Sequence, residues 1–118
     1  MKKQQLRQNR IEIINTLYQI EIGVIFNNYD ELIDDILSKL EEIDEIISNN
    51  LVNYTIDRLS YYDRAIIRYS VYEMKYLQVP AAVVINEAIE ITKLYTDLDD
   101  EKQHKFTNRL LDNINKSL

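Results

Sequence analysis

Cysteine is absent from this chain of 118 residues, and glycine and proline occur once each. Without cysteine the chain forms no disulfide and offers neither a thiolate nucleophile nor a cysteine-based zinc site. So few turn residues disfavour a sheet and favour long helices joined by short polar loops. The chain also lacks a glycine-rich phosphate loop and metal-ligand spacing, and its one histidine, His104, has no serine nucleophile nearby in sequence. We therefore expect no enzyme, no catalytic residue, no metal and no cofactor.

Long apolar runs are missing as well. No segment reaches the length that a membrane span requires, and the basic N-terminus lacks the apolar centre of a signal peptide. We therefore expect a cytoplasmic protein with no membrane partner. The length and the 46% of hydrophobic residues predict a single domain over residues 1–118 with a well-formed core.

Acidic residues outnumber basic ones, giving a net charge of −6, but the two signs are separated along the chain. Residues 1–10 carry four basic residues and no acidic one, whereas residues 29–48 carry eight acidic residues and one basic residue. A cationic end can hold phosphates while the acidic segment faces away or meets a basic partner. Carboxylates spaced along one helix are a weak signal for a metal site, so we interpret the acidic segment as a solvated face.

Apolar residues recur every three or four positions in five segments, which is the period of an amphipathic helix. The predicted helices cover residues 3–22, 31–48, 61–77, 81–95 and 101–115, and a short sixth helix is expected within 52–59. Asp30, Ser60 and Pro80 mark three of the helix starts. Either Asp99 or Asp100 is expected to cap the last helix.

The inner faces of these helices define a predicted core. Its members are Leu17, Ile36, Leu40, Ile67, Met74, Val84, Ala88, Phe106 and Leu110. The opposite face of the 61–77 helix interleaves cations with aromatic rings, at Tyr61, Arg64, Arg68, Tyr72 and Lys75. Such a face can hold phosphates and stack bases. Alternatively, it packs against neighbouring helices and pairs with their acids.

Several motifs in the second half of the chain follow the order and spacing of one family. They are Leu59-Ser60, Ala65-Ile66-Ile67-Arg68, Tyr72-Glu73-Met74, Val79-Pro80, Ile85-Asn86-Glu87-Ala88-Ile89-Glu90, Lys105-Phe106, Asn108 and Leu111-Asp112. With Arg7, Arg10 and Leu17-Tyr18-Gln19 near the start, they resemble the NusB family. The resemblance implies an all-α fold, a compact NusB-like bundle of five to six helices. We expect a shortened middle region, because residues 31–48 leave room for one long helix where relatives usually fit two.

The resemblance also implies a non-enzymatic, RNA-binding transcription antitermination factor. Its partners would be a boxA-type single-stranded RNA, the small-subunit ribosomal protein NusE and the transcription elongation complex. The family pattern and a basic stripe on the last helix together predict the RNA-binding residues Lys2, Lys3, Arg7, Arg10, Lys105, Phe106 and Arg109. The arginines and Lys105 are expected to project from polar helix faces and to converge, while Phe106 either stacks a base or packs in the core. Tyr18 and Asp63 are expected to share one surface that receives NusE.

Departures from the family pattern leave an alternative open. Leu6 and Gln8 stand where family members often have arginine, and Arg109 stands where glycine is common. A protein-interaction module of the same fold that no longer reads RNA is therefore the second hypothesis. A homodimer through the apolar flank of the first helix is a further alternative, since an uncovered apolar patch tends to find a mate.

Overall fold

The computed structural model describes residues 2–97 and 101–118, and these residues form helices and no strand. The α-helices are α1 (Lys3–Glu21), α2 (Glu31–Ser38), α3 (Leu40–Asn49), α4 (Tyr61–Lys75), α5 (Ala81–Tyr95) and α6 (Lys102–Ser117), and a 3₁₀ helix, η1 (Ile56–Arg58), precedes α4. The all-α prediction is confirmed. Within the described ranges, no helix is both long and apolar enough to cross a membrane.

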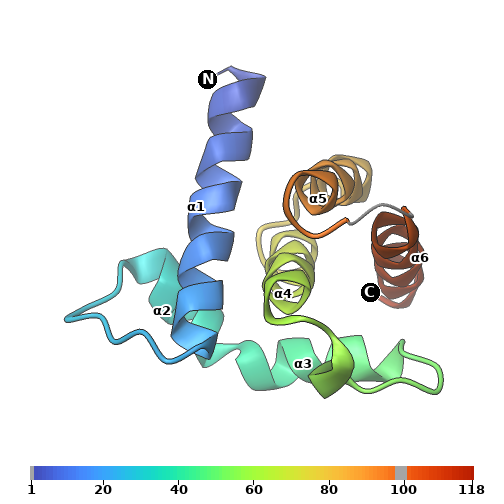
Figure 1. The fold of residues 1–118 in the computed structure, drawn as a ribbon, viewed down its shortest axis with the longest axis horizontal. Helices are drawn as coiled ribbons and strands as arrows, with labels where there is room; N and C mark the ends of the chain where they lie inside the picture. The colour runs from blue at the N-terminus through green and yellow to red at the C-terminus, as the bar shows by residue number, and fades with distance from the viewer. Residues whose placement is uncertain (1, 98–100) are drawn as a thin grey trace.

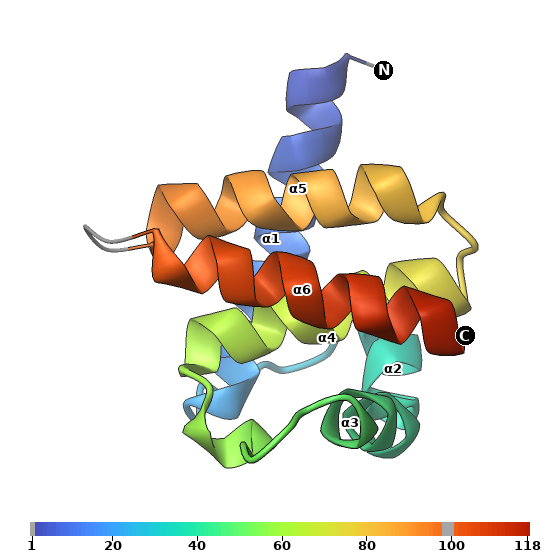
Figure 2. The same cartoon turned by 90° about the vertical axis from the view of Figure 1, so that its right-hand side faces the viewer.

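Helix α4 lies at the centre of the bundle. Eleven of its fifteen residues are buried, because α1 packs on one side of it while α5 and α6 cover another (Figure 1). Helices α5 and α6 run side by side, and the first turns of α1 extend beyond them (Figure 2). The arrangement therefore separates the outer face of α6 from α1 by the layer of α4 and α5.

The predicted core is largely confirmed. Seven of its nine residues are buried, and the other two, Leu40 and Phe106, are half-buried. The largest side chains that are almost completely buried include Ile36, Ile67 and Leu111. Burying such a side chain stabilises the fold by about 1.5–3 kcal/mol, so the apolar stripes rather than local propensities hold the helices together.

The prediction of one helix over residues 31–48 is wrong, because the chain forms α2 and α3 there. At Lys39 the backbone N–H donates to the carbonyl of Ile36, three residues back, which is a 3₁₀ rather than an α-helical bond. The apolar stripe continues across this break, with Ile36 and Ile43 both buried. Since no glycine or proline marks Lys39, the sequence pattern did not reveal the interruption.

Two predicted helix caps are confirmed. The Asp30 carboxylate accepts a hydrogen bond from the backbone N–H three residues on, at 2.9 Å, and Ser60 does the same at 3.2 Å. Each bond satisfies one of the N–H groups that a helix start leaves without a partner. Pro80 directly precedes α5, as predicted. The predicted cap at Asp99 or Asp100 lies outside the described residues.

Candidate nucleic-acid interface

The two arginines of α1 are engaged inside the bundle. The guanidinium of Arg7 donates two hydrogen bonds to the Glu87 carboxylate of α5, at 3.0 and 2.8 Å. Arg10 makes the same two-pronged contact with Glu73 of α4, at 2.8 and 3.0 Å. Both carboxylates are buried, so water and salt screen these attractions weakly. The two pairs tie α1 to α4 and α5.

These ion pairs offset the positive charge predicted for the α1 surface. The Arg10 side chain is only 14% exposed, whereas Arg7 is 28% exposed. Hydrogen bonding to Glu87 raises the pKa of Arg7, and the same contact lowers the pKa of Glu87. The prediction that Arg10 projects from a polar face is therefore wrong, since helical spacing does not reveal a buried partner on another helix. Lys2 and Lys3, at the end of α1, are exposed.

The cations and tyrosines of α4 also contact neighbouring helices. Arg68 donates to both carboxylate oxygens of Asp44 on α3, each at 2.8 Å. Tyr72 donates to Asp35 on α2 at 2.6 Å, and burial together with this bond raises the pKa of Tyr72 to about 12. The alternative of packing and pairing is thus confirmed for these residues, and they offer little to a phosphate.

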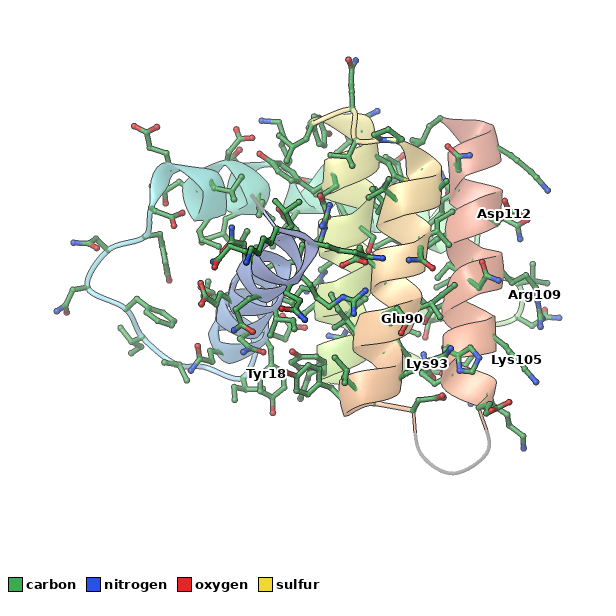
Figure 3. The ribbon with its side chains drawn as sticks, turned by 90° about the horizontal axis from the view of Figure 1, so that it is seen from above. Tyr18, Glu90, Lys93, Lys105, Arg109 and Asp112 are labelled. Carbon is green, nitrogen blue, oxygen red and sulfur yellow. The ribbon has the colours of Figure 1, made fainter. Side chains whose placement is uncertain are left out.

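Helix α6, in contrast, presents cations to solvent. The side chains of Lys105 and Arg109 point away from the bundle (Figure 3), and Lys105 is 64% exposed. The Lys105 ammonium lies 3.8 Å from Glu101, one turn earlier, in a contact that solvent screens. Arg109 makes no hydrogen bond or ion pair with any residue that the structure describes. These two groups are available to an anionic ligand.

The predicted convergence of Arg7 and Arg10 with Lys105 and Arg109 is wrong. Helices α4 and α5 lie between α1 and α6 (Figure 1), and the labelled cations of α6 point away from α1 (Figure 3). Periodicity assigns residues to the outer face of each helix, but it does not fix how the helices are placed around one another. The protein therefore has two separate basic regions.

An aromatic residue that the sequence analysis missed lies beside α6. The ring of Tyr54, in the connection between α3 and α4, has its centroid 5.6 Å from that of Phe106. The Arg58 guanidinium sits 5.0 Å from the Tyr54 ring, within cation–π range. Phe106 thus packs against the core, as one of its two predicted roles required, while remaining partly exposed. The available signal was an aromatic residue four positions before an arginine in a polar connection.

The two predicted partner residues differ in exposure. Tyr18 is half-buried, and its ring meets Tyr62 of α4 edge-on at 5.4 Å. The Tyr62 ring lies 5.5 Å from Tyr95 of α5, so a row of tyrosines crosses three helices. Asp63 is buried and accepts a hydrogen bond from the Ser60 hydroxyl at 2.6 Å, and burial raises its pKa. The prediction that Asp63 lies on the surface beside Tyr18 is therefore wrong, because its carboxylate helps to cap α4.

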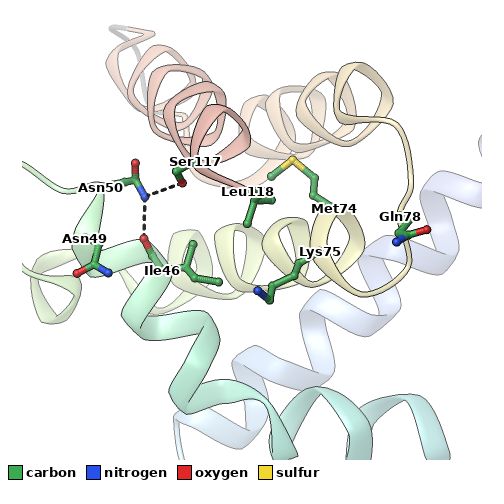
Figure 4. A pocket seen from close by; sticks show the side chains of 8 residues that line it. All are labelled: Ile46, Asn49, Asn50, Met74, Lys75, Gln78, Ser117 and Leu118. Carbon is green, nitrogen blue, oxygen red and sulfur yellow. Dashed lines mark hydrogen bonds between the residues drawn. The ribbon is translucent and has the colours of Figure 1, made fainter.

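A pocket of about 560 Å³ lies where α3, α4 and α6 end (Figure 4). Its lining consists of Ile46, Asn49, Asn50, Met74, Lys75, Gln78, Ser117 and Leu118. The Asn50 amide donates to the Ile46 carbonyl at 2.9 Å, and Lys75 pairs with Glu42 at 3.1 Å. Much of the polar lining is thus already committed to contacts within the protein.

His104 pairs with a single carboxylate. Its Nδ1 lies 2.6 Å from Asp97, and this contact lowers the pKa of Asp97. No cluster of three or more potential metal ligands occurs among residues 2–97 and 101–118. The pair joins the end of α5 to the first turn of α6, which gives it a structural role.

The geometry defines a small helical bundle with exposed cations on α6, a pair of partly exposed rings beside them, and a tyrosine row on another face. The chain belongs to the NusB family, whose model matches residues 4–116. It is 43% identical to the transcription antitermination protein NusB of Listeria monocytogenes serotype 4a over 123 residues, covering 92% of this chain and 94% of the relative. It is 37% identical to the Bacillus pumilus protein of the same name over 128 residues, covering 95% of each.

Solved structures show the same fold. T. maritima NusB matches with a TM-score of 0.77 and 32% identity, covering 93% of this chain and 89% of that one. A chain in the crystal structure of a plectonemic RNA supercoil matches with a TM-score of 0.77 and 27% identity, covering 99% of this chain and 96% of that one. The names of the relatives support a role in transcription antitermination, and family membership implies RNA and the transcription machinery as partners.

Proposed function

We propose that this protein is a non-enzymatic transcription antitermination factor that binds boxA-type single-stranded RNA together with the ribosomal protein NusE. The observation that carries the proposal is the surface of α6, where Lys105 and Arg109 are exposed beside the Tyr54–Phe106 ring pair. Single-stranded RNA is recognised by cations that follow its backbone and by rings that stack its bases. Membership of the NusB family gives this surface its biological setting.

The RNA strand would use two basic regions rather than one. Lys2 and Lys3 stand at the projecting end of α1, and Arg7 beside them keeps part of its side chain exposed. Lys105 and Arg109 lie beyond α5, so a strand that reaches both regions crosses the outer face of that helix. The Glu90 and Lys93 side chains on that face lie 3.7 Å apart and largely balance each other. The crossing therefore adds little repulsion.

The tyrosine row supports a protein interface on another face. Tyr18 and Tyr62 are partly exposed, and Tyr95 is 54% exposed. Partly exposed tyrosines anchor many protein interfaces because they bring a large ring with few rotatable bonds. NusE is the proposed occupant of this face, and the assembled pair would join the transcription elongation complex.

The decisive test is a titration of labelled boxA-type RNA with this protein, alone and with its own NusE, at several salt concentrations. Each phosphate contact releases condensed counterions, so three or four contacts give a log–log salt slope of about −2 to −3. A mutated boxA RNA is the matched control for sequence preference. Absence of RNA binding in the presence of NusE would refute the proposal.

The second candidate function is a NusB-fold interaction module without RNA binding. The observation in its favour is that Arg7 and Arg10 are each paired with a buried glutamate, which removes charge from the surface expected to hold phosphates. This candidate predicts binding of NusE that changes little with added salt, and no binding of RNA. Because both candidates bind NusE, the RNA titration separates them, and a titration with labelled NusE shows that the protein used is competent to bind its partner.

A further inference from the structure

A groove of about 190 Å³ separates α6 from the connection between α3 and α4. We call it the α6 groove, and its lining includes Leu51, Val52, Tyr54, Phe106, Arg109 and Asn113. Leu51 and Phe106 are half-buried and pack on the core, while Val52 is 83% exposed at the rim. The groove is smaller than the cavities of about 300–1,000 Å³ that hold drug-sized ligands, so it suits a single ring or side chain rather than a whole helix.

The charges around the α6 groove favour an anionic ligand. Arg109 borders this groove and also the neighbouring hollow that Lys105 lines. No acidic residue is among the described residues that line the groove. Asp112 also lines that neighbouring hollow, but its carboxylate pairs with Lys116 at 3.2 Å. A phosphate at the mouth of the groove would therefore meet the Arg109 guanidinium beside a carboxylate that already has a cationic partner.

One polar side chain at the rim, Asn113, is available to a ligand. Asn113 is exposed and makes no hydrogen bond with any residue in the described ranges, so its amide can donate to and accept from a ligand. The Arg58 guanidinium lies over one face of the Tyr54 ring, 5.0 Å from the ring centroid, and the Tyr54 hydroxyl donates to the Arg58 carbonyl at 3.1 Å. This contact fixes the orientation of the ring before any ligand arrives, which lowers the entropic cost of binding.

We infer that the α6 groove is a subsite for one unstacked base of single-stranded RNA. The base lies against the Tyr54–Phe106 pair, Asn113 contacts its edge, and Arg109 holds the adjoining phosphate. A ring, an edge contact and a phosphate contact together are what a nucleotide requires, whereas an apolar protein side chain would leave Arg109 and Asn113 unused. The inference rests on the proposed RNA-binding function and assigns Tyr54, Arg109 and Asn113 a part in it.

The test is a double-mutant cycle that pairs the removal of single RNA bases with a substitution in the groove. Affinities are measured for a boxA-type RNA and for a set of RNAs that each lack one base, using the parent protein and Tyr54→Leu. In the parent, loss of one particular base should weaken binding by about tenfold, the scale of one base stacked on an aromatic ring. In Tyr54→Leu the same base loss should cost less than about threefold, because the Tyr54 ring is gone and only Phe106 remains to contact the base.

Arg109→Gln provides a second readout that leaves the aromatic rings in place. This exposed substitution should reduce the salt slope by about 0.7, the contribution of one phosphate contact on a single strand. Lys116→Gln removes one charge from the same helix without touching the groove, and its salt slope should change by less than half as much. Circular dichroism confirms that all three variants remain helical.

The possible results separate the subsite from the function on which it rests. If the parent binds RNA, but no base shows coupling to Tyr54 and Arg109→Gln behaves like Lys116→Gln, the subsite is refuted and the RNA-binding function stands. If the parent fails to bind RNA even with NusE, the RNA-binding function is refuted and the subsite with it. Coupling at one base together with the Arg109 effect supports both.

Discussion

The α1 side and the α6 side of this protein both carry the basic residues that RNA binding calls for, yet they use them differently. On the α1 side, Arg10 meets a buried carboxylate from α4, and Arg7 meets one from α5. On the α6 side, Arg109 faces solvent and has no partner among residues 2–97 and 101–118. The same residue type joins helices on one side and is available to ligands on the other.

The difference arises from the neighbouring helices rather than from the arginines themselves. Glu73 and Glu87 lie on inner faces where burial would be costly without a cation, so α1 has to supply one. Among the described residues, the outer face of α6 packs against no other helix, so its cations need no such compensation. An arginine can thus be assigned to binding only after the carboxylates on adjacent helices have been located.

The largest effect should come from breaking the buried pair on the α1 side. Glu73→Gln removes the carboxylate that Arg10 contacts directly and leaves this largely buried guanidinium only Glu87, 4.0 Å away, which should lower the free energy of unfolding by about 3 kcal/mol. Asp112→Asn breaks the exposed pair with Lys116 on α6 and should change the free energy of unfolding by less than about 0.5 kcal/mol. Urea unfolding followed by circular dichroism measures both. Equal effects would mean that the two sides do not differ as described.

The sequence predicted the helices far better than these ion pairs, because a helix depends on residues close in sequence whereas the pairs join residues far apart in sequence. The bounds of α5 followed from Pro80 and from an apolar stripe within fifteen residues. The Arg7–Glu87 pair joins residues 80 positions apart, and no local pattern connects them. The break at Lys39 was missed for the opposite reason. The apolar stripe keeps one helical register on both sides of it, so the local pattern predicted a single helix.

The candidate site was predictable only in part. Lys105 and Arg109 could be placed on an outer face because the apolar positions of α6 fix its inner face. Tyr54 could not be placed, because it lies between α3 and η1 where no period applies. Its position beside Phe106 depends on how that connection packs against the bundle.

The second prediction concerns pH and again separates the two sides. The pairing with Arg7 lowers the pKa of Glu87, so its contribution to stability is present above the unfolded pKa of about 4.3 and is lost as pH falls through the folded value. Arg7→Gln should lower the free energy of unfolding by about 2 kcal/mol at neutral pH, less than a fully buried pair because Arg7 is partly exposed.

That difference between Arg7→Gln and the parent should narrow as the pH drops below about 4.3, by no more than about 1.4 kcal/mol per pH unit. Urea unfolding between neutral and acidic pH gives the curve. Lys116→Gln, on the α6 side, serves as the control and should track the parent throughout. A difference that stays constant into acid would show that Glu87 does not titrate with the pair.

The third prediction tests the α6 side directly. Lys105→Gln combined with Arg109→Gln should reduce the salt slope of RNA binding by about 1.4, since each phosphate contact contributes about 0.7. The fold should be unaffected because both side chains are exposed. Replacing Arg7 and Arg10 by alanine is a poorer test, because it leaves two buried glutamates unpaired and weakens the fold itself. An unchanged salt slope in the double variant would show that Lys105 and Arg109 do not contact the RNA phosphates.

The smallest effect should come from increasing the exposed charge of α6. Glu101 lies 3.8 Å from Lys105 and adopts a left-handed backbone conformation, with φ of 60°. Asparagine tolerates that conformation better than most residues, so Glu101→Asn should change the free energy of unfolding by less than about 0.5 kcal/mol. Removing the carboxylate leaves Lys105 free to meet a phosphate, so RNA affinity should rise by less than about threefold at low salt and lose this gain at high salt. The matched control is Glu12→Gln, because Glu12 is likewise an exposed acid but lies on α1. An equal gain in RNA affinity for that variant would mean that net charge rather than the α6 surface sets the affinity.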